Sequence, residues 1–91
     1  MMPKIKELKL NLVDDIDKVI NKGDALIVTA PEGHKTLIWI CPRCGKMTST
    51  ARGHKHVFNE ETKSLHPSIL HAKDLGGCGW HGWLKNGFYN G

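Results

Sequence analysis

Two short stretches decide the fold, Cys41-Pro42-Arg43-Cys44-Gly45 and Cys78-Gly79-Trp80-His81. In each stretch two potential metal ligands stand three positions apart, and a glycine or proline lets the chain turn tightly around them. Zn²⁺ in structural sites is bound by four Cys or His side chains arranged as a tetrahedron. We therefore predict a single Zn²⁺ site with the ligands Cys41, Cys44, Cys78 and His81.

Two alternatives to this ligand set stay open. The three cysteines could be completed by a different histidine, namely His54, His56, His66 or His71. Alternatively, three protein ligands and a water molecule would give zinc the open position of a catalytic site. A redox role for the pair Cys41 and Cys44 is disfavoured, because a third cysteine is present and no helix is predicted to begin after Cys44.

The length of the chain fits a single domain over residues 1–91. A domain of this size buries a limited core, and a bound metal commonly supplies the missing stability. No apolar run approaches the roughly 20 residues that cross a bilayer, and charged residues interrupt the N-terminus where a signal peptide would need an apolar run. We expect a soluble cytoplasmic protein, where reduced cysteines favour a metal site over a disulfide.

The hydrophobic pattern predicts a short helix between strands. Apolar residues recur at helical spacing over 13–22, acidic residues fill the first turn, and Gly23 supplies the end. The β-branched runs 25–30 and 36–40 predict a hairpin that leads directly into Cys41. Asn86-Gly87 predicts a tight type I′ hairpin turn near the C-terminus.

Together these elements predict an α+β fold. Residues 1–30 would form a strand-helix-strand extension, and residues 36–89 would form a small zinc-ribbon-like antiparallel β domain. Because metal binding and folding are coupled in such domains, zinc is expected to be needed for the structure of the second part.

Positive charge is concentrated in the same part of the chain. Residues 33–91 contain eight Lys and Arg residues against three acidic ones, whereas residues 1–32 contain five Lys against six acidic ones. A basic surface of this kind could bind nucleic acid or an acidic protein. The candidate contact residues are Arg52, His54, Lys55, His56 and Trp80, the last by stacking on a base.

The C-terminal half also resembles a known family. Pro67-Ser68-Ile69-Leu70, followed by Cys78-Gly79-Trp80-His81 and Trp83-Leu84-Lys85-Asn86-Gly87, is similar to a family of small phage and prophage proteins of unknown function, some labelled ammonia monooxygenase. The resemblance covers about residues 37–88, although many members have a cysteine where this chain has Trp80. It implies a phage-encoded zinc protein in the host cytoplasm and no particular activity.

Three functions follow from these observations. The favoured one is a binding module, held together by zinc, for a host protein or nucleic acid. A zinc-dependent hydrolase or nuclease is the alternative, suggested by the histidines and by Ser68 and Glu60/Glu61, but neither H-E-x-x-H nor H-x-E occurs, and three thiolates make zinc a poor Lewis acid. A structural virion component is the third. An enzyme is therefore not expected.

Overall fold

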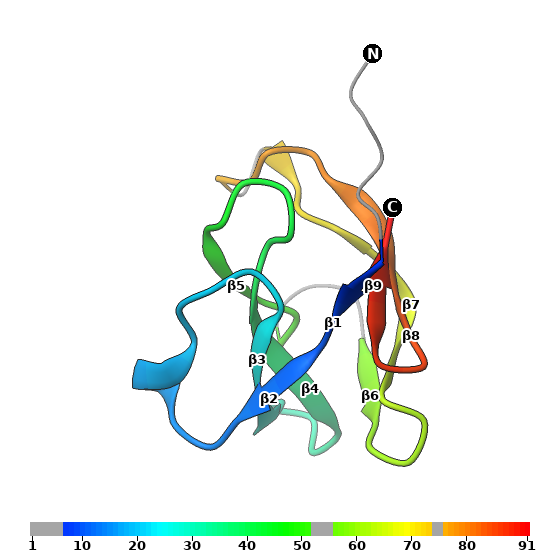
Figure 1. The fold of residues 1–91 in the computed structure, drawn as a ribbon. Coiled ribbons are helices and arrows are strands. Elements are labelled where there is room, and N and C mark those ends of the chain that lie inside the picture. The colour runs from blue at the N-terminus through cyan, green and yellow to red at the C-terminus, as the bar shows by residue number, and fades with distance from the viewer. Residues whose placement is uncertain (1–6, 52–55, 74–75) are drawn as a thin grey trace.

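The computed structural model describes residues 7–51, 56–73 and 76–91. Within these ranges the chain forms nine β-strands in two sheets and one single-turn 3-10 helix, Ile16–Lys18 (Figure 1). The strands are β1 (Leu8–Lys9), β2 (Asn11–Val13), β3 (Asp24–Thr29), β4 (Lys35–Ile40), β5 (Met47–Ser49), β6 (Val57–Asn59), β7 (Ser64–Leu70), β8 (His81–Lys85) and β9 (Phe88–Asn90).

The smaller sheet has the strand order β2-β3-β4-β5. The predicted hairpin is confirmed, since β3 and β4 pair antiparallel with Ala25 opposite Trp39. β5 adds to the other side of β4 and returns from the first Cys pair. β2 pairs parallel with β3, so this sheet is mixed and not purely antiparallel.

The larger sheet is antiparallel, with the order β1-β9-β8-β7-β6. The β8–β9 hairpin turns at Asn86 and Gly87, whose φ angles of 52° and 82° are both positive as a type I′ turn requires, so this prediction is confirmed. Between Leu65 and Ile69 the pairing of β7 with β8 shifts register. β-bulges of this kind re-aim the side chains around them.

The two sheets are joined at the N-terminal end by the short passage from β1 to β2. The Leu10 N–H donates to the carbonyl of Gly87 in the β8–β9 turn, and the Asn11 N–H donates to the carbonyl of Gly23, which directly precedes β3. Consecutive residues thus bond to connecting segments of different sheets. The residues buried between the sheets form one core that includes two tryptophans and a tyrosine, and its members are Leu10, Ala25, Leu37, Trp39, Cys41, Phe58, Leu65, Ile69, Trp80, Leu84 and Tyr89.

The predicted helix over residues 13–22, and with it the α+β class, is wrong. Val13 belongs to β2, and Ile16 and Ile20 are 41% and 66% exposed, so the apolar residues at helical spacing do not share a buried face. The Asp15 carboxylate instead accepts from the Asp17 N–H and caps a single turn. The protein is therefore nearly all β in the part that the structure describes.

No helix among the described residues has the length and apolar composition to cross a membrane.

Candidate metal centre and Ser-His pair

The turn between β4 and β5 presents the first two cysteines. The Cys41 N–H donates to the Lys46 carbonyl, and the Gly45 N–H donates to the Cys41 carbonyl, which closes the turn. Gly45 has a φ of 78°, a conformation that glycine adopts without strain. The backbone N–H groups of Arg43 and Cys44 also donate to the Cys41 sulfur. The Cys41 and Cys44 sulfurs lie within 4.8 Å of each other.

The connection between β7 and β8 supplies the other members. The His71 N–H donates to the Trp80 carbonyl, and the Gly79 N–H donates back to the His71 carbonyl. Gly77 lies so close to His71 that an added Cβ would be 2.6 Å from the imidazole Cδ2. Cys78 therefore folds back beside His71. In Figure 1 this yellow-to-orange connection lies at the same end of the molecule as the green β4–β5 turn.

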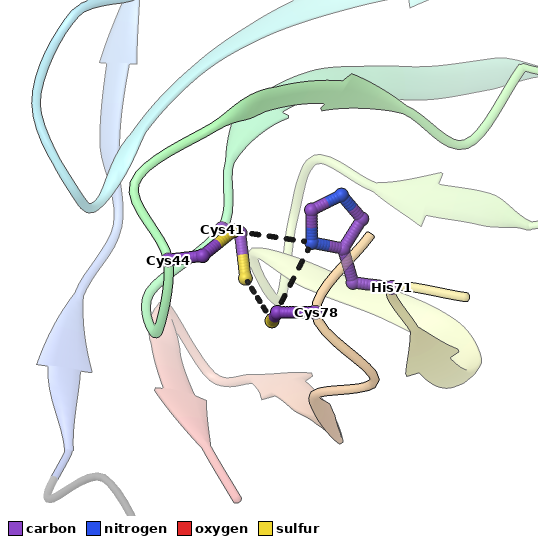
Figure 2. Close-up of side chains that lie close together, drawn as sticks. All are labelled: Cys41, Cys44, His71 and Cys78. Carbon is purple, nitrogen blue, oxygen red and sulfur yellow. Dashed lines mark hydrogen bonds between the residues drawn. The ribbon is translucent and has the colours of Figure 1, made fainter. Parts of the chain in front are cut away.

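Cys41, Cys44, His71 and Cys78 converge in one cluster (Figure 2). Their ligand atoms all lie within 4.8 Å of one another. The Cys41 and Cys78 sulfurs are 3.7 Å apart, and His71 Nδ1 lies 3.5 Å from the Cys44 sulfur and 3.8 Å from that of Cys78. Three thiols and an imidazole nitrogen pointing at a common centre could hold a metal ion.

The surroundings of the cluster affect its proton chemistry. Burial raises the pKa of the Cys41 thiol to about 11. Burial alone would also raise the pKa of Cys78, but hydrogen bonds from the Trp80 N–H and the neighbouring thiols outweigh it and lower that pKa. Burial and the charge of Lys46 lower the pKa of His71, so its ring is neutral and able to bind a metal near pH 7.

The structure brings together three of the four predicted ligands and groups them with His71, one of the alternative histidines. His81 lies elsewhere: its Nε2 is 3.1 Å from the Ser68 hydroxyl, and its ring is 5.5 Å from that of Trp83. Trp80 is buried and His81 is exposed, as expected for neighbouring residues entering β8. The strand thus turns His81 away from the cluster.

Ser68 and His81 form a pair on the solvent-facing side of the larger sheet. Ser68 belongs to the stretch of β7 where the pairing with β8 shifts, and Leu70, two residues later, is directly opposite His81. The Nε2 of His56, which lies just before β6, is 3.1 Å from the Ser68 carbonyl oxygen. Two imidazoles therefore contact Ser68, one at its hydroxyl and one at its backbone.

The other predicted contact residues are only partly described. Arg52, His54 and Lys55 lie outside the described residues. Trp80 is 3% exposed and packs against Trp39 and Tyr89, so neither face of its ring is open to a nucleic-acid base. The sequence reasoning did not single out the pairing of Ser68 with His81. Its only signals were the Pro-Ser-Ile-Leu segment and a surplus of histidines, because partners on neighbouring strands have no fixed spacing in sequence.

The profile of a protein family described as "Bacterial ubiquitination-like system serine protease (BubE)" matches residues 12–90. Comparisons with curated proteins and with solved structures found no match. The resemblance to a phage family is not confirmed by these comparisons. The matched range includes both the Cys/His cluster and the Ser68–His81 pair. This chain therefore belongs to the family of bacterial ubiquitination-like system serine proteases, BubE.

Proposed function

We propose that this chain is a serine protease in which Ser68 is the nucleophile and His81 the general base. The observation that carries the proposal is the 3.1 Å distance between Ser68 Oγ and His81 Nε2. General-base catalysis requires heavy atoms about 2.6–3.2 Å apart, and this pair meets that requirement. The family description independently specifies a serine protease.

The chemistry follows from the tautomer of His81. An imidazole with its proton on Nδ1 accepts the Ser68 hydroxyl proton at Nε2 as Oγ attacks a substrate carbonyl carbon. The imidazolium then gives that proton to the leaving group, and an ester forms on Ser68. Water, deprotonated by the same imidazole, hydrolyses the ester and frees the serine. His56 is suited to hold the backbone of Ser68, since its Nε2–H can donate to the Ser68 carbonyl.

The substrate would lie across the outer face of the larger sheet. His81, Trp83 and Lys85 are exposed along β8, while the residues between them are buried. Trp83, two residues after His81 on β8, is 51% exposed. Leu70, directly opposite His81 on β7, is 59% exposed. A partly apolar strand face of this kind fits an extended protein segment. We therefore propose a protein of the ubiquitination-like system, and not nucleic acid, as the partner.

We further propose that the cluster of Cys41, Cys44, His71 and Cys78 binds Zn²⁺. A tetrahedral shell with Zn–S bonds near 2.3 Å and Zn–N bonds near 2.0–2.1 Å places sulfurs about 3.8 Å apart and sulfur and nitrogen about 3.6 Å apart. The distances of 3.7, 3.5 and 3.8 Å in the cluster match these values. Four protein ligands leave no position for water, which suits a structural and not a catalytic ion.

A fluorophosphonate probe, which reacts with activated serines, tests the nucleophile. We expect labelling of wild-type protein at Ser68, located by peptide mass spectrometry, and none in Ser68→Ala. His81→Gln keeps a polar side chain but cannot take the proton, so labelling should slow by about 100-fold or more.

Ser49→Ala is the matched control, because Ser49 is an exposed strand serine whose hydroxyl accepts from the Ala51 N–H. It should label at the wild-type rate. Absence of any label on zinc-loaded wild-type protein, in a mixture where a reference serine hydrolase is labelled, would overturn the assignment of Ser68.

A further inference from the structure

We infer that His71 and Cys78 are positioning residues for the Ser68–His81 pair, and that the metal they share sets the Oγ–Nε2 distance from the opposite face of the sheet. The inference rests on the proposed role of Ser68 and His81. The metal would then influence the reaction by positioning Ser68 and His81, without itself contacting the substrate.

Sequence spacing connects the two sites directly. Ser68 stands three residues before His71, and His81 stands three residues after Cys78. Between Ser68 and His71 the chain is extended, so an odd spacing places their side chains on opposite faces. Between Cys78 and His81 the chain turns at Gly79, whose φ is 85°, before β8 begins at His81. Accordingly His71 is 6% exposed and packs edge-on against Trp39, whereas His81 is exposed. The cluster lies on the core side of the β7–β8 connection, and the serine pair on its outer side.

Few backbone bonds join the two strands at this point. The ladder pairs Ile69 with Gly82 and Leu70 with His81, and the next pair toward the other end is Leu65 with Leu84, beyond the register shift. At the end of the ladder the connection is closed by the His71 N–H bond to the Trp80 carbonyl. The short ladder beside Ser68 thus depends on how the 71–80 connection is held.

A bound ion would hold that connection against the other sheet. Cys41 is 0% exposed and is fixed by the β4–β5 turn, so it offers a rigid anchor. An ion joining Cys41 and Cys44 to His71 and Cys78 ties β7, through His71, and the approach to β8, through Cys78, to one point. Since proton transfer tolerates only a few tenths of an ångström in the Ser68–His81 distance, this tether would control the reaction without touching it.

The variant His71→Ala, with free imidazole added, distinguishes two roles of His71: binding the zinc ion, and connecting that ion to β7. The added imidazole can refill the cavity of the missing ring and complete the zinc shell, but it does not connect the ion to β7. His71→Cys supplies a fourth ligand that is attached to β7. All forms are compared by bound zinc per chain, by hydrogen exchange, and by the rate of fluorophosphonate labelling at Ser68.

We expect His71→Ala with imidazole to retain zinc and the amide protection of β3 and β4. The amide of residue 71, which bonds the Trp80 carbonyl, should exchange faster than in the wild type. Its labelling at Ser68 should be about 100-fold slower than in the wild type, the scale of lost general-base catalysis. His71→Cys should recover labelling to within about tenfold of the wild type. Wild-type protein in which Co²⁺ replaces Zn²⁺ should label at the same rate, because the ion does not contact Ser68.

Several results would overturn the inference. Imidazole could restore labelling of His71→Ala as fully as the Cys variant does, which would reduce the cluster to a stabiliser of the fold. Zinc-loaded His71→Cys could fail to label, or the rate could change strongly between Zn²⁺ and Co²⁺. A wild-type chain that is not labelled at all would instead contradict the proposed serine protease, so the two failures are distinguishable.

Discussion

The two pairs of potential ligands, Cys41 with Cys44 and Cys78 with His81, have the same spacing in sequence but different positions in the structure. Cys41 and Cys44 both belong to the Cys/His cluster, whereas Cys78 belongs to it and His81 does not. The first pair lies on a closed turn between two strands. In the second pair only Cys78 lies in the loop, because β8 begins at His81.

The difference shows that ligand spacing predicts convergence only when both residues belong to one turn. A turn directs side chains three apart to the same side, but a strand alternates its side chains with every residue. Trp80 enters the core and His81 consequently faces solvent, where it meets Ser68. The same alternation turns His71 inward from the end of β7. The predictions below test this contrast, from the largest effect to the smallest.

Removal of the metal should have the largest effect on stability. Structural Zn²⁺ contributes an apparent binding free energy on the order of 10 kcal/mol in small domains. The cluster joins the β4–β5 turn of one sheet to the β7–β8 connection of the other, so a strong chelator should disorder both sheets. We expect the far-UV circular dichroism and the tryptophan fluorescence to change as zinc leaves, measured with elemental analysis. Spectra unchanged in zinc-free protein would contradict a structural role.

Substitution of the two histidines should separate the two sites. His71→Ala should weaken zinc binding on the order of 100-fold or more, because even residues that only support a ligand cost 10–100-fold. At saturating zinc this corresponds to about 2.7 kcal/mol of apparent stability. His81→Ala should keep the wild-type zinc affinity and lose labelling at Ser68. Competition with a chromophoric chelator measures both affinities, and weaker binding in His81→Ala alone would restore it as a ligand.

Gly82 tests the division of β8 into an inner and an outer face. An added Cβ would overlap the Asn90 carbonyl oxygen and the Trp80 ring, and the carbonyl belongs to the neighbouring strand. Gly82→Ala should therefore lower the free energy of unfolding by about 1–3 kcal/mol, the usual cost of overpacking. Lys85→Ala, on the exposed side of the same strand, should stay within about 0.5 kcal/mol of the wild type. Urea denaturation of zinc-loaded proteins gives both values, and equal stabilities would contradict this division.

The sequence predicts the parts of the site whose residues are close together in the chain, and not the contacts between distant segments. The Cys41–Cys44 turn and the hairpin that leads into it were predicted because their residues are consecutive. The identity of the fourth cluster member required the register of β7 and β8, since His71 reaches Cys44 across 27 positions. Ser68 could not be paired with His81 for the same reason. Burial alternates within a strand, but the sequence alone does not state where β8 begins.

The fold was predicted in part for a similar reason. Strong β-branched runs specified β3 and β4, and Asn86-Gly87 specified the last hairpin. The helix over 13–22 failed because aspartates compete for backbone N–H groups that a helix would need. Asp15 caps one turn, and Asp24 accepts from the Ile20 and Asn21 N–H groups at 3.2 and 2.8 Å. A ten-residue apolar pattern is too short to overcome such local bonds.

Asp24 gives the smallest expected effect, and it tests the local bonds that replace the predicted helix over residues 13–22. Asn11 Nδ2 donates to Asp24 Oδ1 at 2.9 Å, and this bond, followed by the Asn21 N–H, holds the pKa of Asp24 below its usual value. A lowered folded-state pKa stabilises the protein at pH values above the unfolded-state pKa, and this stabilisation is lost as pH falls through the folded-state pKa.

Asp24→Asn should therefore lower the free energy of unfolding by about 1–2 kcal/mol at pH 7, and the difference from wild type should shrink below pH 4. Glu32→Gln, an exposed change in the β3–β4 turn, controls for the lost charge. Acid would release zinc equally from the wild type, Asp24→Asn and Glu32→Gln, so the relevant measurement is the difference between their urea midpoints at each pH. A difference between Asp24→Asn and the wild type that does not change with pH would contradict the assigned role of the Asp24 carboxylate.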